Sequence, residues 1–152
     1  QWEKEIAVGL SGAQYAIQAV APQMIKQKKG SIINITSTSG ITAPNHSKYP
    51  AGRFKSAAYP TVKTALLGLT RAWASYFSSV GVPNVRVNAV AFGAVNFKEI
   101  TPELLEKLKG RNMLGRPARP DEYHGAIVFL ASDASAFMTA QTLIMDAGQT
   151  AW

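Results

Sequence analysis

Residues 56–71 read SAAYPTVKTALLGLTR and place a tyrosine and a lysine four positions apart. Apolar residues recur at spacings of three and four from Val62 to Phe77, which predicts a helix over Tyr59–Ser79. Pro60 fits the first turn of this helix, where no backbone donor is needed. Tyr59 and Lys63 then lie one turn apart on the same face.

A phenol and an ammonium in this arrangement can act on one substrate. A free phenol has a pKa of about 10, and a positive charge beside it favours the phenolate and lowers that value. The phenol can then serve as a general acid and base near neutral pH. Because tyrosine–lysine pairs of this spacing also occur on helix surfaces without function, the interpretation depends on the flanking segments.

Those flanking segments read as buried strands. Residues 31–37 are rich in β-branched apolar side chains and end in Ser37, and residues 85–91 form a second apolar run followed by Gly93. Residues 143–145 predict a last short strand. Because helical patterns separate these runs, we expect an α/β fold with a parallel sheet. Ligands bind at the carboxyl ends of such strands, where Ser37 and Gly93 stand.

The remaining segments complete this pattern. Helices are predicted over residues 1–29, with Gly30 as the stop, and over residues 102–109. Another helix opens at Pro120, and its expected buried side is Ala126, Ile127, Phe129, Leu130 and Ala131. Residues 38–58 form a long loop, which we interpret equally as a substrate-side insertion or as a neutral surface insertion.

Composition narrows the function classes. The 152 residues contain no cysteine and two distant histidines, which argues against a metal site and excludes disulfides. No apolar run is long enough for a membrane span, and no secretory signal opens the chain, so we expect a cytoplasmic protein. The net charge of +7 is scattered, and without an aromatic platform we expect no nucleic-acid partner.

Ser37, the Tyr59–Lys63 pair and the strand ending at Gly93 together resemble the short-chain dehydrogenase/reductase family, over nearly the whole chain. The resemblance implies a Rossmann-like, doubly wound parallel sheet and one domain spanning residues 1–152. It also implies hydride transfer between NAD or NADP and an alcohol or carbonyl. Tyr59 would be the general acid/base, Lys63 would lower its pKa and hold the nicotinamide ribose, and Ser37 would bind the substrate oxygen.

The resemblance further implies that Phe92, Gly93 and Val95 lie against the nicotinamide, together with Tyr59 and Lys63. It implies a homodimer or homotetramer acting on a small molecule. The chain lacks the glycine-rich turn that receives the pyrophosphate in this family, so we interpret it as the carboxyl-terminal part of the fold, with the amino-terminal half absent.

Other departures from the family pattern lie elsewhere in the chain. Gly9 stands where the family usually has an asparagine, and Phe92 stands where it has proline. Phe97 replaces a frequent hydroxyl, and Asp146-Ala147-Gly148 replaces Asp-Gly-Gly. These departures leave open an alternative function, a non-catalytic subunit or scaffold that keeps the fold without binding nicotinamide.

Overall fold

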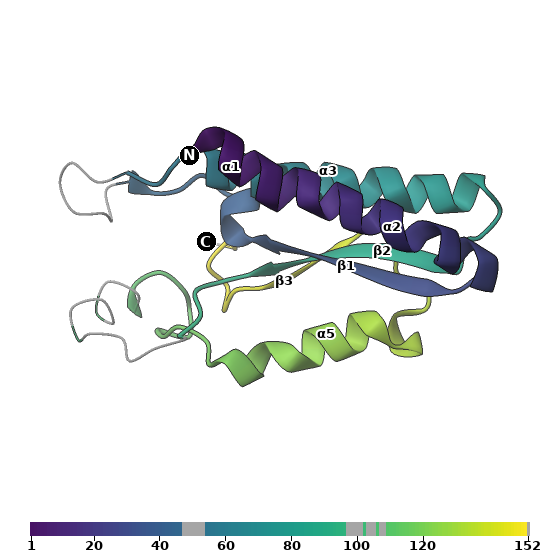
Figure 1. The fold of residues 1–152 in the computed structure, drawn as a ribbon. Helices are drawn as coiled ribbons and strands as arrows, with labels where there is room; N and C mark the ends of the chain where they lie inside the picture. Colours follow the sequence, from purple (N-terminus) through teal and green to yellow (C-terminus); the bar gives the residue numbers. More distant parts are fainter. Residues whose placement is uncertain (47–53, 97–101, 103–105, 107–108, 152) are drawn as a thin grey trace.

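A three-stranded parallel sheet forms the centre of the molecule (Figure 1). The computed structural model describes residues 1–46, 54–96, 102, 106 and 109–151. The strands are β1 (Gly30–Ser37), β2 (Val85–Phe92) and β3 (Thr142–Met145), in the order β1-β2-β3. Strands β1 and β2 pair along their whole length, which brings Ser37 beside Phe92 at the carboxyl end. The predicted parallel sheet is confirmed.

Helices cover both faces of this sheet (Figure 1). On one face, α1 (Trp2–Ile6), a π-helical turn (Ala7–Ser11) and α2 (Gly12–Gln27) follow one another and lie beside α3 (Ala58–Ser79). On the other face lies α5 (His124–Ala131), which follows a 3-10 turn over Pro120–Tyr123. Helices on both faces of a parallel sheet make the doubly wound arrangement that the sequence predicted.

The core lies on the two sides of β2, because alternate residues of a strand point to opposite faces. Val87 and Phe77 of α3 are fully buried in one apolar cluster, and Val90 and Leu130 of α5 are fully buried in the other. The central strand therefore holds the two helical layers in place, and its carboxyl end becomes a fixed platform for loops.

Two local expectations were wrong. The helical run predicted over residues 1–29 ends at Gln27, the last residue of α2, because Lys28 caps it with a left-handed φ of 54°, and Gly30 already belongs to β1. On α5 only Ala126 and Leu130 are buried, Ile127 is partly buried, and Phe129 is 37% exposed. The three strands cover a single stripe of α5, so the residues beside that stripe face outward.

The predicted helix over residues 102–109 lies largely outside the described residues. In the described part of the chain, none of the helices combines the length and apolar character that a membrane crossing needs.

Candidate active site

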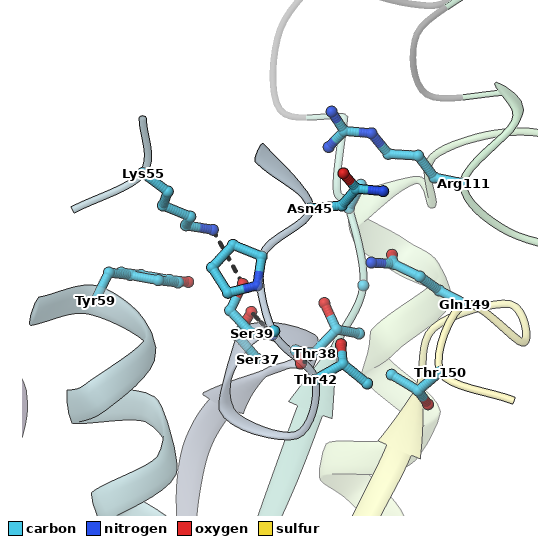
Figure 2. A pocket seen from close by; sticks show the side chains of 14 residues that line it. Ser37, Thr38, Ser39, Thr42, Asn45, Lys55, Tyr59, Arg111, Gln149 and Thr150 are labelled. Atoms are coloured by element: carbon cyan, nitrogen blue, oxygen red, sulfur yellow. Dashed lines mark hydrogen bonds between the residues drawn. The ribbon is translucent and has the colours of Figure 1, made fainter. Parts of the chain in front are cut away.

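A cavity of about 500 Å³ opens at the carboxyl end of the sheet, and it collects residues from distant parts of the sequence (Figure 2). Ser37 comes from the end of β1, Gly93 follows β2, and Tyr59 comes from the first turn of α3. All three line the cavity. The structure thus brings Ser37 and Tyr59, which are 22 positions apart, to one site.

The Ser37 hydroxyl is held by the turn that follows it. Its oxygen accepts a hydrogen bond of 3.2 Å from the Ser39 backbone N–H, so Ser37 caps the short 3-10 helix Thr38–Gly40. A serine hydroxyl has one hydrogen to donate as well as lone pairs to accept. The cap uses a lone pair, and the hydroxyl hydrogen remains available to an oxygen in the cavity.

Lys63 lies one turn beyond Tyr59, as the spacing predicts. Its ammonium nitrogen is 5.7 Å from the centroid of the Tyr59 ring and donates a 2.9 Å hydrogen bond to the Ile35 carbonyl of β1. The side chain is half-buried, and burial lowers the pKa of Lys63 from its ordinary value, because desolvation disfavours the charged form. An ammonium has three donors, so the bond to Ile35 leaves others for further partners.

Close contacts fix α3 against β1 and the turn that follows it. The Thr36 hydroxyl donates to the Lys63 carbonyl at 2.6 Å, and the Thr64 hydroxyl donates to the Gly40 carbonyl at 3.1 Å. A Cβ atom at Gly40 would lie 2.7 Å from the Lys63 backbone, so only glycine permits this approach. The distance between Ser37 and the Tyr59–Lys63 pair is therefore set by two hydrogen bonds from threonine hydroxyls to backbone carbonyls and by the close approach of Gly40 to Lys63.

Gly93, Phe92 and Val95, the other residues predicted to contact the nicotinamide, differ in where they lie relative to this cavity. Gly93 lines it, and its backbone N–H donates to the Met145 carbonyl at 2.9 Å. The Phe92 ring stacks on Tyr123, with centroids 4.1 Å apart, so this side chain belongs to the α5 face of the sheet. Val95 forms a backbone bridge with Ala118 beyond the cavity.

Several cavity residues were missed by the sequence reasoning. Lys55 donates a 3.1 Å hydrogen bond to the Ser39 hydroxyl, and its nitrogen lies 4.3 Å from the centroid of the Tyr59 ring. Arg111, Gln149 and Thr150 also line the cavity, on the side away from Lys55 in Figure 2. The sequence contains one signal for Lys55. This lysine precedes Tyr59 by four residues, which is the same spacing at which Lys63 follows Tyr59.

Comparison with known proteins shows the family to which the chain belongs. A family model described as enoyl-(acyl carrier protein) reductase matches residues 1–150. The chain belongs to the short-chain dehydrogenase/reductase family. It is 37% identical to the 3-oxoacyl-[acyl-carrier-protein] reductase FabG of Thermotoga maritima, over 97% of this chain and 56% of that protein. It is 35% identical to a probable galactose dehydrogenase of Rhizobium meliloti, over 97% of this chain and 55% of that protein.

Solved structures of dehydrogenases share the fold. A gluconate 5-dehydrogenase from Burkholderia cenocepacia, in complex with NADP and tartrate, matches with a TM-score of 0.84 and 32% identity, over 99% of this chain and 56% of that one. A 4-hydroxyisoleucine dehydrogenase complexed with NADH matches with a TM-score of 0.85 and 30% identity, over 99% of this chain and 60% of that one. The chain thus spans just over half the length of these relatives.

The structure explains the departure at Gly9 from the dehydrogenase pattern. Gly9 lies in the π-helical turn, and a Cβ atom there would come 2.6 Å from Cγ1 of Val62 on α3. Valine is stiff at χ1 and cannot easily turn aside. Position 9 therefore serves close packing between the first helix and α3, and an asparagine would not fit without a shift.

The long loop contributes to the cavity through both of its described ends. Thr38, Ser39 and Thr42 line it from one end and Lys55 from the other. This placement favours the substrate-side interpretation of the loop over a neutral surface insertion. Residues 47–53 lie outside the described residues, as does Phe97.

The residues present fit the nicotinamide end of a dinucleotide. Tyr59 and Gly93 line the cavity, and the Lys63 ammonium keeps donors beyond its bond to Ile35. At Gly93, the space of a side chain is taken by Asp146, whose Cα would lie 2.9 Å from an added Cβ, so this loop offers its backbone. No glycine-rich turn for the pyrophosphate occurs in the 152 residues.

Proposed function

We propose that the protein is an oxidoreductase that moves hydride between NAD or NADP and an alcohol/carbonyl substrate. The observation that carries this proposal is the convergence of Ser37 and Tyr59 on one cavity, with the Lys63 ammonium 5.7 Å from the Tyr59 ring. The relatives support the class, since the solved dehydrogenases are complexes with NADP or with NADH.

The proposed roles follow from the chemistry of the side chains. In the direction of reduction, the Tyr59 hydroxyl gives its proton to the carbonyl oxygen, and the Ser37 hydroxyl donates a hydrogen bond to the same oxygen. The Lys63 ammonium stabilises the negative charge that develops on the tyrosine oxygen and binds the hydroxyls of the nicotinamide ribose. The bound cofactor supplies the hydride, and the reverse direction uses the same groups.

The site is held in place before substrate arrives. Ser37 is fixed by its cap to Ser39, and α3 is fixed to β1 through the Thr36–Lys63 and Lys63–Ile35 hydrogen bonds. Donors that are already aimed at the reacting oxygen need no reorganisation during the reaction, which is how such sites lower a barrier.

We further propose that the protein forms a homodimer or homotetramer. An open, mostly apolar groove lies between α3 on one side and the π-helical turn and α2 on the other. Leu10, Tyr15 and Leu69 are among its lining residues. Gly68 and Ala72 on α3 allow a close approach by another helix. Ordinary intrachain packing is the other interpretation of these small residues, and sedimentation over a range of protein concentrations separates the two.

A second candidate is a non-catalytic subunit that retains the fold. It is favoured by the packing role of Gly9, which stands where the family usually has an asparagine. This candidate predicts that the protein binds neither NADH nor NADPH.

The test combines binding with turnover. The protein is titrated with NADH and NADPH while the nicotinamide fluorescence is followed, and it is then given a panel of ketones and aldehydes while the loss of reduced nicotinamide is recorded. Saturable binding of one cofactor with carbonyl-dependent oxidation is the expected result. If neither cofactor binds and no carbonyl is reduced, the oxidoreductase proposal is wrong and the scaffold is favoured.

A further inference from the structure

A second lysine lies beside the tyrosine that is proposed to transfer the proton. Lys55 comes from the segment before α3, and its ammonium nitrogen is 4.3 Å from the centroid of the Tyr59 ring, whereas that of Lys63 is 5.7 Å away. Figure 2 shows the Lys55 side chain next to the Tyr59 ring, with its nitrogen directed at Ser39. The roles proposed above use Lys63 and leave Lys55 without one.

The same ammonium is linked to the turn that carries Ser37. Lys55 donates a 3.1 Å hydrogen bond to the Ser39 hydroxyl, and the Ser39 backbone N–H donates a 3.2 Å hydrogen bond to the Ser37 hydroxyl. Two hydrogen bonds therefore connect Lys55 to Ser37 through one residue. The Lys55 nitrogen is held between the ring of Tyr59 and the turn that follows β1.

A cation at this distance from a phenol ring acts on its protonation. The face of a neutral ring attracts a cation that lies within about 6 Å of its centroid. When the phenol loses its proton, part of the negative charge spreads into the ring, so the attraction becomes one between opposite charges. Lys55 and Tyr59 are both partly buried, and exclusion of water strengthens this attraction. The position of Lys55 therefore favours the deprotonated phenol.

Other charged groups act on the same pair. Lys63 lies on α3 one turn after Tyr59, and burial lowers the pKa of Lys63. Burial also lowers the pKa of Lys55, and the positive charge of Arg111 lowers it further. A negative charge on Tyr59 acts in the opposite sense and stabilises a protonated lysine beside it. The protonation states of Lys55 and Tyr59 are therefore coupled.

We propose that Lys55 is a positioning residue for the proton transfer: its ammonium stabilises negative charge on Tyr59 and, through Ser39, holds the turn that presents Ser37. This inference rests on the proposed function for the role of Tyr59. It adds a residue that lies outside the tyrosine–lysine spacing and that acts from a different segment of the chain.

The first test needs no turnover. The full chain is labelled with ¹³C at the tyrosine Cζ atoms, and the resonance of Tyr59 is assigned by its loss in Tyr59→Phe. Its change with pH then reports the ionisation of this one phenol. Lys55→Met removes the charge and keeps an unbranched side chain, and we expect it to move the ionisation of Tyr59 to higher pH by at least about half a unit.

Two variants make this comparison specific. Lys55→Arg keeps the positive charge, so the ionisation of Tyr59 should stay close to that of the unmodified protein. Lys26→Met removes an exposed charge at the far end of α2 and should leave it unchanged. If Lys55→Met leaves the ionisation of Tyr59 where it is, the proposal is wrong, whatever the variant does to the Tm.

The second test follows turnover. The carbonyl that is reduced fastest in the panel described above is replaced by the corresponding alcohol, and kcat/KM for its oxidation is measured against pH. The deprotonated phenol is the active form in this direction. The rising limb should therefore move to higher pH in Lys55→Met, with about a threefold or larger loss below it. Lys55→Arg should restore the limb, which a purely structural role for Lys55 does not predict.

The two tests separate this inference from the proposed function. A shifted ionisation of Tyr59 in Lys55→Met, with no turnover by the unmodified protein, would contradict the oxidoreductase proposal and leave the coupling of Lys55 to Tyr59 standing. Turnover that is lost in Tyr59→Phe, but has the same pH dependence in Lys55→Met as in the unmodified protein, would support the oxidoreductase and overturn the role of Lys55.

Discussion

Single atoms decide the packing around Gly9. A Cβ atom added at Gly9 would lie 2.6 Å from Cγ1 of Val62. A Cβ atom added at Gly12, one turn further on, would have its nearest neighbour, the Ala7 carbonyl oxygen, at 3.6 Å. The same substitution at the two positions should therefore have opposite effects, although both glycines lie in one helical run.

Gly9→Ala is expected to lower the free energy of unfolding by about 1–3 kcal/mol, the usual cost of overpacking. Gly12→Ala should raise it by about 0.5–1 kcal/mol, because alanine loses less backbone entropy in a helix. Urea denaturation of both variants measures the difference. If both substitutions shift the midpoint in the same direction, the contact between Gly9 and Val62 does not limit the packing.

Ala147 is a residue in a conformation that suits glycine. Its φ of 56° lies in the left-handed region, at the position where the dehydrogenase pattern has glycine. Alanine there costs about 1–2 kcal/mol, part of which is offset by the greater entropy of glycine in the unfolded chain.

Ala147→Gly is expected to raise the free energy of unfolding by up to about 1 kcal/mol. The control is Ala19→Gly on the exposed side of α2, which should lower it by about 1 kcal/mol. Thermal denaturation of the two variants provides the comparison. A loss of stability in Ala147→Gly as large as in the control would show that the left-handed residue carries no strain.

At the scale of the elements, an ion pair joins Arg116 to the 3-10 turn Pro120–Tyr123, which leads into α5. The two terminal nitrogens of Arg116, Nη1 and Nη2, each donate to the Glu122 carboxylate at 2.7 Å, and the Arg119 backbone N–H donates to it at 2.8 Å. The hydrogen bonds from Arg116 and Arg119 lower the pKa of Glu122 to about 2 from an ordinary value of 4.5. Because Arg119 is the N-cap of the 3-10 turn, its hydrogen bond to Glu122 also caps the start of that turn.

The pH dependence follows from this shift. Because the folded state binds the proton more weakly, the contribution of Glu122 is complete above about pH 4.5 and is lost as the pH falls toward 2. Glu122→Gln should therefore lower the Tm near neutral pH, and the gap should close in acid. Glu3→Gln, on exposed α1, is the control. A gap that stays constant down to about pH 2 would contradict the assignment.

The elements were largely predictable from periodicity, and the site only in part. The apolar spacing that ends at Phe77 and the β-branched run before Ser37 are local patterns, and they gave the helix and strand that hold the tyrosine and serine. The close approach of Gly9 to Val62 joins two segments that are distant in the sequence, so no local pattern reveals it. Lys55 and Arg111 are 56 positions apart, and only the folded chain brings both to the cavity.

At the scale of the whole molecule, the described sheet is open at its sides. Central β2 pairs with a neighbour on each edge, whereas β1 pairs only with β2 among the described residues. Ile35 on β1 is 43% exposed, and Val128 and Phe129 on α5 are exposed as well. The chain spans just over half the length of the curated relatives in the comparison.

The most direct test of the account removes one oxygen atom at the proposed centre of proton transfer. Tyr59→Phe and, as a control, Tyr15→Phe on exposed α2 are compared with the unmodified protein for carbonyl-dependent oxidation of NADH or NADPH and for cofactor binding. The account predicts that Tyr59→Phe loses turnover by at least about a hundredfold, while its cofactor affinity and the activity of Tyr15→Phe stay close to those of the unmodified protein. Unchanged turnover in Tyr59→Phe would contradict it.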